Sequence, residues 1–367
     1  MTSTFGKNIV TTIFGESHGH GIGVVIDGLP AGQRIDLEEL SAFLMRRAPG
    51  QSAYTTERKE QDEPVFLSGI LDGVLTGSPL SAVIYNKDQR SKDYSNLRDM
   101  PRPSHADWNA HVKYKGHMDM RGGGPFSGRI TAPLSIAGGI AKQILKSRGI
   151  YVGAHLAEVA GIPDTCWDKV HLTEEDLRIP GQKDFPTLSE DAAAEIKSAI
   201  QRARDEQNSV GGIIECAAIG LPQGLGSPNY GGVESRLSHV LFSVPAVRGV
   251  SFGTGFPATR MTGRDHNDEY QIVDGQVRTV TNHAGGVVGG ITNGMPLIFQ
   301  VAIKPTSSIG LPQQSFSIAE MVEKTLEVVG RHDPCIAVRA VPVIEAACAL
   351  VLLDLMEDEN GFRSNQK

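Results

Sequence analysis

The chain of 367 residues contains only four cysteines, and none of them forms a CxxC pair. A disulfide framework in a chain of this size needs many more cysteines, and a structural zinc site usually needs them at paired spacing. We therefore expect free thiols and no metal site.

A long hydrophobic run and an excess of positive charge are also missing. The strongest apolar stretch, residues 346–353, is far shorter than the ~20 residues of a membrane helix, and the N-terminus lacks an apolar signal-peptide core. The net charge of −7 argues against general nucleic-acid binding, which needs a clustered basic face. The sequence thus predicts a cytoplasmic protein without nucleic-acid or membrane partners, in which local basic residues hold any anionic ligand.

No fixed-period repeat and no low-complexity linker divides the chain, whereas glycine is abundant at 42 residues. Paired glycines let backbone approach backbone or a ligand closely. A single domain over residues 1–367 with mixed helices and strands is therefore favoured, with a short polar tail, 356–367, expected to be disordered.

Capping signals and hydrophobic patterns predict the main elements. Strands are expected at 9–14, 213–219 and 295–303. Helices are expected from the cap Asp36 to Arg47, at 134–148, from the cap Ser189 to about 206, from the cap Ser317 to Gly330, and from Pro342 to Asp354.

A glycine-flanked Ser-His pair, Gly15–Gly19, follows the first of these strands. Two chemistries compete for it. Gly15-x-Ser17-x-Gly19 fits the nucleophile elbow of a serine hydrolase, whereas His18 could act as a proton donor beside an anionic substrate. The hydrolase interpretation is weakened because Ser17 precedes the several strands that come before such an elbow.

Further segments have the composition of a binding site. A glycine-rich stretch with Ser127 and Arg129 lies ahead of a helix, where freed backbone amides can cradle an anion, although an ordinary turn has the same composition. Arg47 at a helix end has the alternative role of a solvated charge that offsets the helix dipole. The combined set predicts a site for a multiply charged small molecule: cations Arg47, Arg121, Arg129, Lys304 and Arg331, with His18, His105 and Asp333 for proton transfer.

These segments together resemble the chorismate synthases. Six motifs follow the family order between about Phe5 and Leu355: Gly15–Gly19, Asp88–Tyr94, Arg102–Asp107, Asn282–Gly286, Lys304–Ser308 and Arg331–Cys335. The resemblance implies an α+β fold, a β-α-β sandwich whose sheets enclose helices, assembled as a homotetramer. It also implies the 1,4-anti elimination of phosphate from 5-enolpyruvylshikimate 3-phosphate to give chorismate, with an absolute need for reduced FMN and no net redox change.

The resemblance also implies roles for individual residues. His18 matches the histidine that acts on the departing phosphate, and His105 matches the one that protonates the reduced flavin. Asp333 matches the carboxylate that works with flavin N5 in removing the ring proton. Substrate-binding positions are Arg47, Arg129 and Arg331. Flavin-binding positions are Arg47, Ser127, Ala246, Gly289, Lys304, Pro305, Thr306, Ser307, Ser308 and Arg331.

The chain departs from the commoner family pattern at several positions. Ala48, Ala53 and Pro125 stand where many members have arginine, and Pro245 replaces an asparagine. Alanine and proline cannot replace a bidentate guanidinium, so Arg58 or Lys59 is a candidate for compensation. The resemblance leaves open whether the protein reduces its own flavin with NADPH or depends on a separate reductase.

Overall fold

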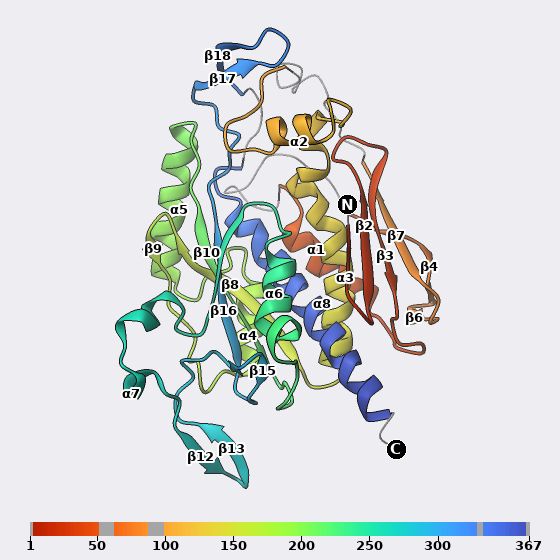
Figure 1. Ribbon diagram of the computed structural model, residues 1–367, viewed down its shortest axis with the longest axis vertical. Helices are drawn as coiled ribbons and strands as arrows, with labels where there is room; N and C mark the ends of the chain where they lie inside the picture. The colour runs from red at the N-terminus through yellow and green to blue at the C-terminus, as the bar shows by residue number, and fades with distance from the viewer. Residues whose placement is uncertain (1–2, 51–61, 87–98, 329–332, 365–367) are drawn as a thin grey trace.

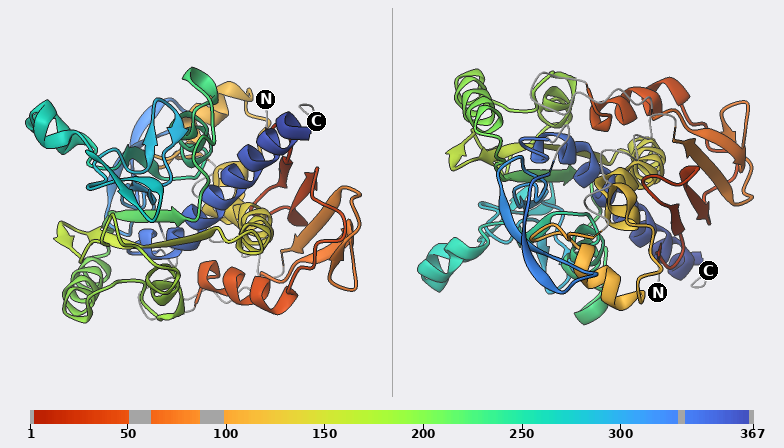
Figure 2. Two further views of the ribbon diagram at one scale, coloured as in Figure 1. Left: turned by 90° about the horizontal axis from the view of Figure 1, so that it is seen from below. Right: turned by 90° about the horizontal axis from the view of Figure 1, so that it is seen from above.

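Two antiparallel five-stranded sheets enclose a layer of helices (Figures 1 and 2). The computed structural model describes residues 3–50, 62–86, 99–328 and 333–364. The motif Asp88–Tyr94 therefore lies outside the described residues. The expected α+β sandwich is confirmed, and one hydrophobic core joins both sheets to the helices between them.

The first sheet has the order β1-β2-β3-β7-β4. Alternation places Ile22, Val24 and Ile26 of β3 in the core, as expected for a sheet with one buried face. Its strands are β1 (Thr4–Phe5), β2 (Val10–Gly15), β3 (Gly21–Asp27), β4 (Val65–Ser68) and β7 (Leu80–Tyr85).

The second sheet has the order β11-β16-β10-β8-β9. Ile214 and Cys216 of β10 face the central helices, and Glu215 between them faces the opposite side. Its strands are β8 (Tyr151–Val159), β9 (Ile162–Pro163), β10 (Gly212–Ile219), β11 (Val247–Phe252) and β16 (Leu297–Ile303). The predicted strands at 9–14, 213–219 and 295–303 are thus confirmed within a few residues.

Helices α3 (Thr131–Lys146) and α8 (Ala337–Ser364) run side by side between the sheets (Figure 1). They approach closely at Gly138, where an added Cβ would lie 2.3 Å from Ala346 Cα. Helix α1 (Leu37–Arg47) begins at Asp36, whose side chain accepts hydrogen bonds from two backbone amides, as predicted. None of the helices in the described part of the chain is long and apolar enough to cross a membrane.

The other elements are short or lie on the outside. The hairpin β12–β13 projects from the body below α7 (Figure 1). Outside the two large sheets are the helices α2 (Asp107–Lys113), α4 (Glu174–Gln182), α5 (Glu190–Asp205), α6 (Val233–Leu241) and α7 (Gly263–His266) and the paired strands β5–β6 (Ile70–Leu71, Val74–Leu75), β12–β13 (Tyr270–Val273, Gln276–Thr279), β14–β15 (Val287–Val288, Ile291–Thr292) and β17–β18 (Gln313–Ser317, Val322–Leu326).

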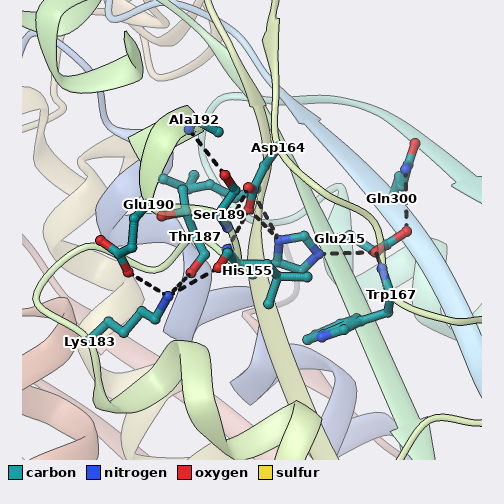
Figure 3. A network of polar contacts seen from close by, with 12 residues as sticks. His155, Asp164, Trp167, Lys183, Thr187, Ser189, Glu190, Ala192, Glu215 and Gln300 are labelled. Atoms are coloured by element: carbon teal, nitrogen blue, oxygen red, sulfur yellow. Dashed lines mark hydrogen bonds and ion pairs between the residues drawn. The ribbon is translucent and has the colours of Figure 1, made fainter. Parts of the chain in front are cut away.

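A buried polar network fastens the outer face of the second sheet to the segment that covers it (Figure 3). His155 of β8 is fully buried, and its Nε2 lies 3.0 Å from Glu215 Oε2 of β10. On its other side, Nδ1 lies 3.3 Å from Asp164 Oδ2, and Asp164 accepts backbone hydrogen bonds from Leu188 and Ser189. The network therefore joins two strands to the loop ahead of α5.

Three predicted elements need correction. The expected helix after Ser317 is wrong, because β17 and β18 form a hairpin there. Ser317 Oγ does accept a hydrogen bond from Glu320 N, but it does so across the hairpin turn, which Asp99 also supports by accepting from Ala319 N. A hydrogen bond typical of a helix cap thus serves a turn instead.

The last helix is longer than expected at both ends. Helix α8 begins at Ala337, so Pro342 lies inside it rather than at its first position, and it continues to Ser364. The sequence predicts a disordered tail from residue 356, but this tail is helical as far as Ser364. Packing of the apolar α8 between both sheets outweighs the local preference against an internal proline.

Candidate active site

The Gly15–Gly19 loop joins β2 to β3 in the first sheet. Ser17 and His18 are both buried, and the side-chain amide of Asn86 donates to the carbonyl oxygens of Glu16 and Gly19. Ser17 N donates to Gly124 O at 3.3 Å. The loop is therefore held from two sides and faces the glycine-rich segment.

The two candidate histidines, His18 and His105, lie against neighbouring residues of that glycine-rich segment. Gly122, Gly123 and Gly124 have φ values of 59°, 84° and 53°, a backbone conformation that favours glycine. An added Cβ at Gly122 would lie 2.4 Å from His18 Cδ2, and one at Gly123 would lie 3.1 Å from His105 Cε1. The bare backbone thus lets His18 and His105 approach the same short stretch of chain.

This geometry excludes the serine hydrolase alternative. A nucleophile elbow is a sharp turn between a strand and a helix. Ser17 instead lies between two antiparallel strands of one hairpin, and its hydroxyl faces the position of Gly122.

His105 belongs to a charged cluster with Arg102 and Asp107. Its Nδ1 lies 2.5 Å from Asp107 Oδ1, and Arg102 donates to both oxygens of Asp107, from Nε at 2.8 Å and from Nη2 at 2.9 Å. Burial alone would raise the pKa of Asp107, but the hydrogen bonds from Arg102 and His105 outweigh it and hold that pKa well below its usual range. The ionised carboxylate favours a proton on Nδ1 and fixes the orientation of the ring.

The loop from Lys304 to Ser308 packs against this cluster. Arg102 Nη1 donates to Ser308 Oγ at 3.0 Å, and Lys304 Nζ donates to Ser104 O at 2.7 Å. Lys304 N also donates to Ala246 O, so that the predicted flavin positions 246 and 304–308 come together. Burial and, to a smaller extent, the nearby Arg248 lower the pKa of Lys304.

Arg47 and Arg129 share one buried carboxylate, Asp62. Arg47 Nη2 lies 2.8 Å from Asp62 Oδ2, and Arg129 Nη1 lies 2.9 Å from Asp62 Oδ1. Arg129 Nε also donates to Asn86 Oδ1 at 2.6 Å, which connects the pair to the loop that carries His18. The alternative of a solvated helix-end charge is wrong for Arg47, because this residue is 2% exposed.

Asp333 pairs with an arginine that sequence reasoning did not single out. Arg339 Nη1 donates to Asp333 Oδ2 at 2.6 Å, and Arg339 Nε donates to Arg47 O at 3.0 Å. The predicted ligand Arg331 lies outside the described residues, as do Ala53, Arg58 and Lys59. Arg339 thus joins the described part of the Arg331–Cys335 motif to the end of α1.

Some predicted residues have other contacts. Arg121 is exposed and pairs with Asp119, and Ser127 Oγ accepts from Arg129 N. Gly289 lies in the β14–β15 turn, and among the described residues no hydrogen bond or ion pair joins this turn to the histidine and arginine clusters.

Five residues of the site have no role predicted from the sequence: Asp62, Asn86, Arg102, Asp107 and Arg339. Arg102 and Asp107 flank His105 in one motif, and alternating opposite charges around a histidine were a usable signal. Arg339 had a weaker signal, a cation in the first turn of a helix. Asp62 and Asn86 are remote in sequence from the residues that they contact, and nothing local marks them.

The chain is similar to known proteins over nearly its whole length. The family model described as chorismate synthase matches residues 9–356. Curated chorismate synthases of Lancefieldella parvula and Chitinophaga pinensis are 43% and 45% identical, covering 100% and 99% of this chain and 100% and 98% of their own.

A solved structure gives the same result. A crystal structure of chorismate synthase matches with a TM-score of 0.75 at 25% identity, covering 97% of this chain and 93% of its own. The chain belongs to the chorismate synthase family.

Proposed function

We propose that the protein catalyses the 1,4-anti elimination of phosphate from 5-enolpyruvylshikimate 3-phosphate to give chorismate, and that it requires reduced FMN without net redox change. Family membership supports the reaction. The observation that carries the assignment to this site is the convergence of His18, His105 and the glycine loop beside the buried arginine pair.

The residues around Lys304 fit an anionic cofactor such as FMN. Thr306 Oγ1 is buried without a hydrogen-bond partner among the described residues, so it is available to a ligand. Lys304 supplies a cation, and the bare backbone at Gly122 and Gly123 lets His18 and His105 lie directly against it. Reduced FMN, when bound, would supply electron density to the substrate as the carbon–oxygen bond breaks.

The substrate carries two carboxylates and a phosphate, and Arg47 and Arg129 are its proposed cationic ligands. Their shared partner Asp62 leaves the three groups with one net positive charge. Asp62 also fixes both guanidinium groups before substrate binds, and such preorganised charges stabilise developing negative charge efficiently.

Proton transfer falls to three side chains. His18 donates a proton to the departing phosphate from its buried place against Gly122. Asp107 holds the His105 ring, which would supply a proton to reduced FMN when the cofactor is bound. Asp333 takes the proton that leaves the ring. Each such group typically contributes ~10²–10⁴-fold to a rate.

The family resemblance supports a homotetramer in the cytoplasm. The exposed hairpin β12–β13, with Tyr270 and Ile272 on its surface, offers apolar area for assembly. Although Ala48 and Pro125 replace family arginines, Arg47 and Arg129 are retained, and Asp62 pairs with both of them.

The test is the stoichiometry of product to flavin. The elimination leaves the oxidation level of the substrate unchanged overall, so no reductant is consumed. With FMN reduced once under anaerobic conditions, many equivalents of chorismate should form per flavin, and oxidised FMN should give none. Product that stops at one equivalent per flavin, or equal product with oxidised FMN, would contradict the proposal.

A further inference from the structure

We infer that Arg339 is a positioning residue for the reaction: it orients the Asp333 carboxylate and ties it to the end of the helix that carries Arg47. This inference rests on the proposed function, in which Asp333 takes up the ring proton. Arg339 itself has no assigned contact with substrate or cofactor.

Arg339 donates two hydrogen bonds from different nitrogens of its guanidinium group. Nη1 donates to Asp333 Oδ2 at 2.6 Å, a distance typical of a short charge-assisted hydrogen bond. Nε donates to Arg47 O at 3.0 Å. Because the guanidinium is planar and rigid, fixing Nε on the α1 carbonyl also fixes the direction in which Nη1 meets the carboxylate.

Arg47 in turn contacts the start of α3, where Thr131 Oγ1 accepts from its Nη1 at 3.2 Å. A chain of hydrogen bonds therefore runs from Asp333 through Arg339 and Arg47 to α3. A proton acceptor must lie within hydrogen-bond reach of the proton that it removes, and displacement by ~1 Å can cost about 10²-fold in rate. Arg339 fixes the position of the proposed proton acceptor, Asp333, relative to Arg47, the arginine that we propose binds the substrate.

Helix stability does not explain an arginine at this position. Arg339 is the third residue of α8, and the positive end of the helix dipole disfavours a cation there. The first turn of α8 contains no acidic residue to offset it. The favourable partners of Arg339 are instead the Asp333 carboxylate and the carbonyl oxygen of Arg47, and both lie outside α8.

A cavity of about 240 Å³ borders Arg339 and allows a direct test. Its lining also includes Arg46, Lys183 and Asp184. A water molecule takes ~30 Å³ of liquid volume, so the cavity has room for a small planar cation in addition to the space that a shortened side chain leaves. Added guanidinium ion can therefore reach the place of the missing group in Arg339→Ala.

The experiment compares turnover in Arg339→Ala, Asp333→Asn, the double variant and a control, Lys183→Ala. Lys183 borders the same cavity but donates to Glu190 and to the carbonyls of Thr187 and Leu188. We expect Arg339→Ala to lower kcat at least tenfold, with a smaller change in KM. Millimolar guanidinium chloride should restore at least a third of the lost rate, whereas equal sodium chloride should not, and Lys183→Ala should show no guanidinium response.

Two further readouts separate positioning from folding. In the Asp333→Asn background, Arg339→Ala should cause less than a twofold further loss, because the group that it orients is already disabled. The dissociation constant for oxidised FMN, measured without turnover by flavin fluorescence, should stay within twofold of the parent value. If Arg339→Ala does not fold, Arg339→Lys keeps the charge but loses the fork, and a tenfold fall in kcat there supports the same role.

The outcomes distinguish this inference from the proposed function. If the parent protein forms no chorismate with reduced FMN, or if Asp333→Asn keeps the parental rate, the proposed function or the role of Asp333 fails. If the parent is active and Asp333→Asn is not, but Arg339→Ala keeps its rate within twofold, the inference about Arg339 fails. Losses that add fully in the double variant would overturn it as well.

Discussion

Replacing Glu215 by glutamine should destabilise the protein by disabling the buried network around His155 (Figure 3). Glu215 is 1% exposed, and its Oε2 accepts from His155 Nε2 at 3.0 Å and from Trp167 N at 3.3 Å. Removing one partner of a buried ion pair costs about 3–5 kcal/mol. Glutamine keeps an acceptor oxygen and Asp164 still faces the imidazole, so we expect the lower end, about 3 kcal/mol.

The loss should depend on pH in a defined window. Burial opposes a charge on His155, but the hydrogen bonds and charges of Asp164 and Glu215 outweigh burial and raise the pKa of His155 above 6.5. The stabilisation that charged His155 provides is therefore complete below pH 6.5 and is lost as pH rises through the raised pKa. Burial likewise opposes a charge on Glu215, but the interaction with His155 outweighs burial and lowers the pKa of Glu215 below 4.5. The stabilisation that ionised Glu215 provides is therefore complete above pH 4.5 and is lost as pH falls through the lowered pKa. The effect of Glu215→Gln should therefore be largest between pH 4.5 and 6.5.

Thermal unfolding followed by circular dichroism tests this expectation. At about 2 °C per kcal/mol for a large domain, the melting temperature should fall by ~6 °C at pH 6 and by less at pH 9. The matched control is Glu190→Gln, which removes a carboxylate from the exposed pair with Lys183 and should leave the melting temperature close to that of the parent. A fall of less than ~2 °C at pH 6, or one that is equal at both pH values, would refute the reasoning.

Two further predictions concern the proposed site. Arg129→Ala or Arg47→Ala should raise the dissociation constant for substrate at least tenfold, since a charge-assisted hydrogen bond contributes about 1.5–3 kcal/mol; unchanged affinity with a lower melting temperature would limit both arginines to holding Asp62. His105→Ala should alter the absorption spectrum of the reduced, substrate-bound flavin more than His18→Ala, because Asp107 orients only His105 among the two. Identical spectra of the two variants at equal flavin occupancy would contradict this division of roles.

Local signals in the sequence determined much of the helical framework. Asp36 and Ser189 cap α1 and α5 through hydrogen bonds to residues two or three positions away, which is why both helix starts could be predicted. The glycine triplet ahead of α3 likewise predicted a close backbone approach. The same kind of signal failed at Ser317, because a hydrogen bond to Glu320 fits a hairpin turn as well as a helix.

Tertiary structure alone decided how the charges pair. The motifs predict His18, His105, Arg47, Arg129 and Asp333 as candidate site residues, but they predict neither Asp62 between two arginines nor Arg339 beside Asp333. His155 and Glu215 are 60 residues apart and meet only because β8 and β10 are neighbours in one sheet. Capping depends on backbone within one turn of the chain, whereas the partner of a buried charge depends on which strands and helices pack together, and no local pattern records that.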